Sequence, residues 1–221
     1  MQKSLPAFAL LELLVASVLS TALFLAATAV VRNYNQILAR NMALAQLNGH
    51  QSIVENFMKR LINNAGYQNI DNNLGDHPGC FLSASPVLLS AAYDTLSGTR
   101  ERVDLDLVAT TGLHRGFDAG NGVLEFSIYD WNSSSKQFVF RNRWDGPLVD
   151  QVEGFYVSAS PSGCNPELII VGVLLRSRKP VFHSPRPQSF SSENFSLATV
   201  SSTHIFSYNE FLVAPKNVVL R

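Results

Sequence analysis

The feature that most constrains this sequence is an apolar run near its start, from Phe8 to Val31. The only formally charged side chain in this run is Glu12, and Arg32 closes it. As an α-helix the run would be about 36 Å long at roughly 1.5 Å per residue, which exceeds a hydrocarbon core of about 30 Å. The run therefore predicts a membrane-spanning helix.

Composition sets further limits on what the chain can be. Its 221 residues leave room for one ordinary domain plus an appended segment, and 46% apolar residues are enough for a packed core. The 17 basic residues balance the 17 acidic ones, so the formal charge is zero and nothing favours a polyanionic partner. We therefore expect a packed domain that does not bind nucleic acid.

Three interpretations compete for the first 31 residues. A secretory signal would use Lys3 as its basic start and Ala27-Thr28-Ala29 as its cut site, leaving Val30 first, but the run is too long and Glu12 opposes entry into lipid. An uncleaved anchor fits the length, yet it gives no reason to keep a carboxylate that costs about 2–3 kcal/mol at mid-membrane. The third interpretation, given next, assigns a role to the Glu12 carboxylate.

The segment from Lys3 to Ser17 resembles the class III leader of type IV prepilins. In that family a short basic leader stays in the cytoplasm, a prepilin peptidase cuts before a phenylalanine-like residue, and the new N-terminus is methylated. The resemblance implies a leader of residues 1–7, a cut between Ala7 and Phe8, and N-methylation of Phe8. Glu12 then becomes the fifth mature residue, where the family carries its assembly glutamate. The chain departs from the family at Ala7, where glycine is usual, although alanine is also small.

Beyond Arg32 the apolar residues recur every three, four or seven positions, which is typical of one face of an α-helix. We expect one helix over residues 8–64, with residues 8–31 transmembrane. Gly49 is its weak point, because an interior glycine costs about 1 kcal/mol relative to alanine, and Gly66 fits a C-terminal cap. The residues of this apolar stripe are Ile37, Leu44, Leu47, Val54, Phe57 and Leu61.

A second resemblance concerns the segments Leu47–His50 and Phe57–Tyr67, which are similar to PilW-type minor pilins. That family tends to place Asn-Gly within this helix and to end it with Ala-Gly-Tyr. Leu174–Arg178 and Phe211–Arg221 are more weakly similar to the same family and to the related J-type minor pseudopilins. The resemblance implies an α+β, type IV pilin-like fold, in which the long helix packs on an antiparallel β-sheet head of residues 65–221.

Within the head, alternating or continuous apolar runs predict strands, and segments rich in Ser, Pro, Asn, Asp and Gly predict loops. We expect loops over residues 69–86 and 180–194. Leu168–Leu175 is almost entirely apolar, as is typical of a central strand covered on both faces. The predicted strands are Val103–Ala109, Val123–Tyr129, Gln137–Arg141, Val152–Ser158, Leu168–Leu175 and Glu210–Leu220.

The chain has two cysteines, Cys80 and Cys164, which lie outside the ligand spacing of zinc sites. In an exported head we expect them to form a disulfide. In a reducing compartment the alternative is two separate buried thiols.

No motif indicates catalysis. The sequence lacks Gly-x-Ser-x-Gly, a phosphate-binding glycine loop and His-Glu-x-x-His, and its histidines do not stand at zinc spacing. A cluster of oxygen ligands suggests calcium, but its spacing is not that of an EF-hand, so a turn is favoured. We therefore expect no enzyme activity, cofactor or metal. The residues weighed for metal binding are His50, His77, His114, His183 and His204, then Asp71, Asn73, Gly75 and Asp76. Trp131, Trp144 and the tyrosines could form a binding surface, although such aromatics more often belong to a core or its edge.

The resemblance implies a minor type IV pilin that helps to initiate or cap pilus assembly, supporting adhesion and twitching motility. Its partners would be other minor pilins, the major pilin, the prepilin peptidase and the inner-membrane assembly platform. It would lie in the inner membrane as a single-pass protein with a periplasmic head, then in a pilus or pseudopilus at the cell surface. The alternatives are a minor pseudopilin of a type II secretion system and a bitopic periplasmic sensor or adhesin.

Overall fold

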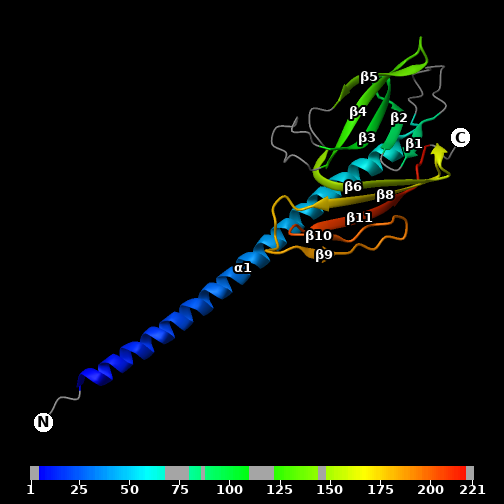
Figure 1. Cartoon of the computed structure of the whole chain (residues 1–221). Coiled ribbons are helices and arrows are strands. Elements are labelled where there is room, and N and C mark those ends of the chain that lie inside the picture. Colours follow the sequence, from blue (N-terminus) through cyan, green and yellow to red (C-terminus); the bar gives the residue numbers. More distant parts are fainter. Residues whose placement is uncertain (1–4, 68–79, 86–87, 110–121, 144–147, 218–221) are drawn as a thin grey trace. The chain divides into compact units, whose positions relative to one another are not determined.

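The computed structural model describes residues 5–67, 80–85, 88–109, 122–143 and 148–217; of residues 5–9, 108, 109 and 143 it describes the backbone alone. The chain divides into two compact units, Met1–Met42 and Ala43–Arg221. The second unit contains the whole sheet together with the last part of the N-terminal helix, and the first contains the rest of that helix (Figure 1).

The helix α1 spans Leu5–Asn64 without a break. Pro6 lies in its first turn, where a missing N–H removes no helical hydrogen bond. At the other end, the Ala65 N–H still bonds to the Leu61 carbonyl at 3.1 Å, but Gly66 has φ 75° and donates to the Ala92 carbonyl instead. Glycine adopts this left-handed conformation without steric cost, so the predicted helix end and its cap are confirmed.

Within the second unit, one face of α1 is buried against the sheet. The predicted apolar stripe is present there, with Leu44 and Phe57 partly buried. Ile37 belongs to the first unit and is 59% exposed, so it is not part of this face. The helix residues that are almost fully buried are Leu47, Val54, Met58, Leu61 and Ile62.

The sheet strands are antiparallel throughout. A nine-stranded sheet runs in the order β11-β8-β6-β4-β3-β2-β1-β7, and β5 pairs with β4 beside this path. A separate two-stranded sheet joins β9 and β10. The strands are β1 (Leu82–Ser85), β2 (Leu88–Asp94), β3 (Arg100–Ala109), β4 (Gly122–Asn132), β5 (Gln137–Arg143), β6 (Val149–Ser160), β7 (Gly163–Cys164), β8 (Leu168–Arg176), β9 (Arg186–Gln188), β10 (Val200–Ser202) and β11 (Phe206–Val213).

The strand β8 lies between β6 and β11, and its residues from Val171 to Leu175 are all buried. One face meets the helix side of the core. On the other face, a Cβ added at Gly172 would lie 2.5 Å from the Tyr208 hydroxyl and 3.2 Å from the Phe195 ring. Both faces of β8 are therefore closely covered, as its continuous apolar run predicts.

The predictions for β3, β4, β5, β6 and β8 are confirmed, with ends shifted by at most a few residues. The prediction of a strand over 210–220 is wrong in its position. β11 begins at Phe206, because its register is fixed by pairing with β8, and it ends at Val213, shortly before Pro215. Proline has no N–H to donate to a neighbouring strand.

Two predicted loops contain strands. The predicted loop over 69–86 includes β1, which pairs with β2 and β7, and the predicted loop over 180–194 includes β9, which pairs with β10. Val181 and Phe182, in the second of these segments, pack against the core. Residues 68–79, in the first, lie outside the described part of the chain.

Candidate functional site

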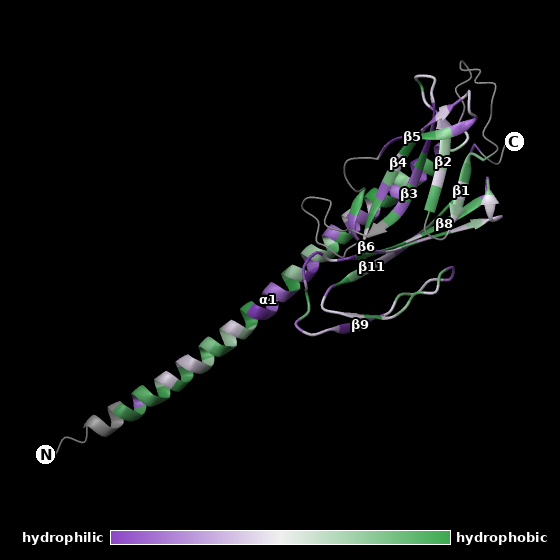
Figure 2. Cartoon of the chain, turned by 45° about the horizontal axis from the view of Figure 1, so that its top comes forward, coloured by the Kyte–Doolittle hydropathy of each residue, from purple (hydrophilic) through white to green (hydrophobic). Residues whose placement is uncertain are grey.

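The apolar part of α1 exposes most of its side chains. Described residues from Leu10 to Val31 are all exposed, with Leu13 at 73% and Leu23 at 70%. Figure 2 shows this part of the helix as nearly continuous apolar ribbon, interrupted by few polar residues. It is long and apolar enough to cross a membrane. Since so much exposed apolar surface is unfavourable in water, this helix is a candidate membrane anchor.

Three hydroxyl residues in this part of the helix, Ser17, Thr21 and Thr28, make hydrogen bonds within it. Ser17 donates to the Leu14 carbonyl at 2.8 Å, Thr21 donates to the Ser17 carbonyl at 2.7 Å, and Thr28 donates to the Leu25 carbonyl at 3.1 Å. Such bonds back to the preceding turn lower the cost of placing hydroxyls in lipid.

Glu12 differs from these hydroxyl residues. Its side chain is exposed, and within the part of the chain that the structure describes it has no hydrogen-bond or ion-pair partner. A carboxylate in an apolar setting is costly unless it is paired. The arrangement therefore leaves Glu12 available to a group outside this chain.

Ala7 and Phe8 lie in the first turns of α1. Their side chains are outside the described residues, so leader cleavage between them and methylation of Phe8 stay predictions.

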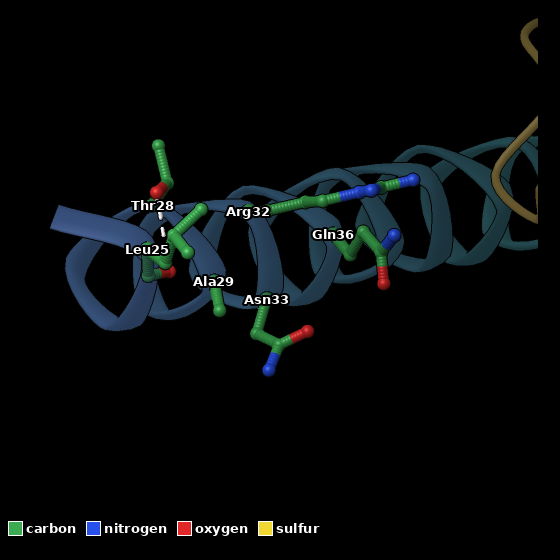
Figure 3. Close-up of a pocket in the computed structure, with 6 residues that line it drawn as sticks. All are labelled: Leu25, Thr28, Ala29, Arg32, Asn33 and Gln36. Atoms are coloured by element: carbon green, nitrogen blue, oxygen red, sulfur yellow. Dashed lines mark hydrogen bonds between the residues drawn. The ribbon is translucent and has the colours of Figure 1, made fainter. Parts of the chain in front are cut away.

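The polar part of α1 begins at Arg32. An open hollow on the helix surface is lined there by apolar residues on one side and polar residues on the other (Figure 3). Figure 3 shows Arg32 extending along the helix toward Gln36. The lining residues are Leu25, Thr28, Ala29, Arg32, Asn33 and Gln36. This is where the composition of the helix changes from apolar to polar.

Polar contacts join α1 to β11 in the second unit. The Gln51 amide donates to the Ser207 hydroxyl at 2.9 Å, and the Asn209 amide donates to the Glu55 carboxylate at 3.2 Å. The Lys59 ammonium bonds to the same carboxylate and is the main reason that the pKa of Glu55 is lowered. These bonds fix the helix against the edge strand β11.

The structure joins Cys80 and Cys164, the residues expected to pair in an exported head, in a disulfide with Cα atoms 5.2 Å apart. The bond lies beside the β1–β7 pairing, where Cys164 is opposite Ser83. Next to it, Asn165 has φ 52° and its side-chain oxygen accepts hydrogen bonds from the backbone N–H groups of Phe81 and Leu82. This corner ties the chain that follows α1 to the chain that precedes β8.

The residues weighed for metal binding are not brought together where the structure describes them. His50 lies 3.9 Å from Asp150, His204 contacts Ser202, and the described residues contain no group of three or more metal-ligating side chains. Trp131 packs on Phe138, with ring centroids 5.0 Å apart. His183 is exposed. The other candidates lie outside the described residues, namely His77, His114, Trp144 and the calcium cluster Asp71, Asn73, Gly75 and Asp76.

Two polar clusters were not expected from the sequence. Asp94 and Arg100 form a fully buried ion pair across the β2–β3 turn, at 2.6 Å and 3.1 Å. Glu210 accepts hydrogen bonds from Ser192, Asn194 and Tyr208, which attaches the segment between β9 and β10 to β11. The Asp94–Arg100 pair could have been predicted from the sequence, because an Asp and an Arg flank a turn there. The Glu210 cluster could not, because only the tertiary fold brings its residues together.

A search of solved structures matches the type IV-like pilin TTHA1219 from Thermus thermophilus. The TM-score is 0.51 and the sequence identity is 13%, and the match covers 78% of this chain and 98% of that chain. A scan against protein-family models gives no match, and neither does a search of curated proteins.

The chain therefore has a type IV pilin-like α+β fold. A long apolar N-terminal helix packs its second part on a large antiparallel sheet, as the sequence predicts. At 13% identity the match shows this fold and not the subtype, so the similarity to PilW-type minor pilins stays an expectation from the sequence.

Proposed function

We propose that this chain is a minor type IV pilin that helps to initiate or cap pilus assembly. The observation that carries the proposal is a pilin-like fold in which the apolar part of the helix, from Phe8 to Val31, has one charged side chain, Glu12, with no partner among the described residues. A subunit that assembles by packing against its neighbours needs an exposed apolar helix surface of this kind. Before assembly the apolar side chains lie in lipid, and after it they contact the helices of neighbouring subunits.

In this proposal the partner of Glu12 belongs to another subunit. Removal of residues 1–7 gives this chain a positively charged amine at Phe8, and leader removal gives each neighbouring subunit an amine of its own inside the same apolar environment. Opposite charges that meet away from water attract strongly, and a lone carboxylate there is costly. Pairing Glu12 with the amine of an adjacent subunit removes that cost, so it favours docking into the filament or priming complex.

The head would supply specificity in this complex. Its partners in the proposal are other minor pilins and the major pilin, and the inner-membrane assembly platform would receive the helix. The protein would be held in the inner membrane by α1, with the head in the periplasm. The disulfide fits an oxidising compartment, because such bonds are rare where glutathione keeps thiols reduced.

The second candidate function is that of a minor pseudopilin of a type II secretion system. Such a protein would share all of these features. Deletion of the gene separates the two, with surface pili and secreted proteins measured in the same cultures. Loss of pili with normal secretion supports the pilin, and loss of secretion with normal pili supports the pseudopilin. If both remain normal, the chain takes part in neither assembly.

A further inference from the structure

In the described part of the chain, the sheet extends past the end of α1, so this helix does not cover all of its helix-facing side. Ala91 and Val103, which are cross-strand partners, lie in the core beneath the helix. The next residues on the same face, two positions further along each strand, are Tyr93 and Glu101, again partners. Asp130 on β4 is paired with Glu101 in turn. Among the residues that the structure describes, no helix lies over this row beyond Asn64.

A hollow of about 330 Å³ lies at this place, within the range of small-ligand sites. Its walls come from the end of α1, the residues just after it and the β2–β3 turn. They include exposed apolar and aromatic surface, since Leu96 is 88% exposed and Tyr67 is 46% exposed. The lining residues used here are Asn64, Tyr67, Tyr93, Thr95, Leu96 and Glu101.

The turn that carries Leu96 is held in place by its own hydrogen bonds. The Thr95 N–H donates to the Thr99 carbonyl at 2.7 Å, and the Thr95 and Thr99 hydroxyls lie 2.8 Å apart. Gly98 supplies the positive φ, 91°, that this turn requires. A rigid rim means that little conformational freedom is lost when a ligand binds.

Beside the hollow, the described residues carry an excess of negative charge. The Arg141 guanidinium lies 2.7 Å from Glu101 and 3.0 Å from Asp130, so two carboxylates share one cation. The other carboxylate of the lining, Asp94, is neutralised by buried Arg100. Glu101 also acts on Tyr93, because burial first and then the Glu101 charge raise the pKa of the Tyr93 hydroxyl, which Arg141 partly offsets. The charge of Glu101 is therefore felt inside the hollow.

We propose that this hollow binds a long basic side chain of another protein, with lysine as the reference ligand. Aromatic faces and a carboxylate are the groups that attract ammonium and guanidinium ions. The aliphatic stem of a lysine would lie on Leu96 and Tyr67, and its ammonium would meet Glu101, in the way that long cationic side chains cover apolar surface. The inference does not rest on the pilin proposal, since it uses the second unit alone.

The test is a ligand titration followed by NMR, with the full chain in micelles of a non-ionic detergent. A zwitterionic detergent is avoided because its own ammonium group would compete. The probe is Nα-acetyl-lysine amide, and Nα-acetyl-norleucine amide, which has a similar stem without the charge, is its control. We expect saturable binding of the lysine probe and binding of the norleucine probe weaker by about tenfold or more.

Three variants locate the site. Glu101→Gln should weaken lysine binding by about tenfold or more, because it removes the charge that lines the hollow. Glu153→Gln is the matched control, since it removes the same charge from a surface ion pair with Arg176 on β6 and β8, and it should leave the affinity unchanged. Arg141→Gln should tighten binding several-fold, because it leaves both carboxylates to the ligand, and a merely damaged head would not show this gain.

The proposal is overturned if the lysine probe does not bind saturably or if the norleucine probe binds equally well. It is also overturned if Glu153→Gln lowers the affinity as much as Glu101→Gln, or if Arg141→Gln weakens binding.

Discussion

Glu12 carries the main functional prediction at the scale of a single residue. Its carboxylate is the only formal charge from Phe8 to Val31, whereas nearby hydroxyls such as Ser17 bond within the helix. Replacing Glu12 by alanine should ease membrane insertion, because the cost of burying the carboxylate disappears. The same change should weaken docking into the filament or priming complex.

The measurement compares Glu12→Ala with the parent for membrane level, leader removal, co-purification with other minor pilins and surface piliation. Ser17→Ala is a matched control in the same helix, since its hydroxyl is already satisfied, and it should assemble normally. Lost assembly with a normal membrane level is the expected result. Normal complexes and pili in Glu12→Ala would contradict the role.

Glu210 leads to a prediction about pH. Burial alone would raise the pKa of its carboxyl, but hydrogen bonds from Ser192, Asn194 and Tyr208 lower it below 4.5 overall. Because the folded-state pKa lies below the unfolded value, the carboxylate stabilises the fold above pH 4.5. This contribution is lost as the pH falls through the lowered pKa.

Denaturant unfolding of the parent and Glu210→Gln at a series of pH values checks this. The variant should be less stable than the parent at neutral pH, and the difference should shrink on acidification below 4.5. Glu193→Gln, an exposed neighbour, should follow the parent throughout. A constant difference between Glu210→Gln and the parent would show that the hydrogen bonds do not depend on the charge.

At the scale of secondary-structure elements, helix ends and strands that depend on local sequence patterns can mostly be predicted from the sequence. The end of α1 follows from Gly66, and β8 follows from its continuous apolar run. The strands β1 and β2 were missed because they are rich in Ala and Ser, which have little strand preference. They become strands because β3 and β7 pair with them, and no local pattern contains that information.

The residues of the candidate site also divide into those that the sequence identifies and those that only the fold reveals. Glu12 and the two cysteines stand out in the sequence by type and position. The hollow beside Glu101 does not, because it depends on where α1 ends relative to strands β2, β3 and β4. The Glu210 cluster likewise joins residues from two segments whose pairing is fixed only by the fold.

Two glycines give opposite predictions for one substitution. Gly49 lies inside α1 with nothing within 4 Å of an added Cβ, so Gly49→Ala should stabilise the head by about 0.5–1 kcal/mol through helix propensity. At Gly122 in β4 an added Cβ would lie 2.2 Å from the Val152 carbonyl oxygen, so Gly122→Ala should destabilise it. Thermal unfolding of both variants is the measurement. A lower melting temperature for Gly49→Ala would mean that the position needs glycine for another reason.

The disulfide gives a prediction about the connection between elements. Cys80 and Cys164 are 84 residues apart, and closing a loop of that length stabilises a fold by about 4–5 kcal/mol in the chain-entropy model. A Cys80→Ser and Cys164→Ser double variant should lose stability of this order in urea unfolding. Thiol labelling of unreduced, denatured parent should find no free cysteine. Two labelled cysteines per chain would contradict the bond.

At the scale of the whole molecule, the chain has two parts whose surfaces have different requirements. The exposed apolar side chains of α1 need lipid or neighbouring helices, whereas the head is a closed core of one helix face and a large sheet. The pilin-like fold combines these two parts in one chain, and the proposed assembly role depends on a free N-terminus at Phe8. Leader removal is therefore the step on which the pairing of Glu12 and the docking of the helix both rest.

Intact-mass and N-terminal analysis of the membrane-bound protein, in cells with and without the prepilin peptidase, tests this step directly. With the peptidase, we predict a mature chain that begins at Phe8 and carries one methyl group on its amine. Without it, the chain should retain residues 1–7 and an unmethylated Phe8. A chain that has the same N-terminus in both strains, whether Met1 or Val30, would contradict the account.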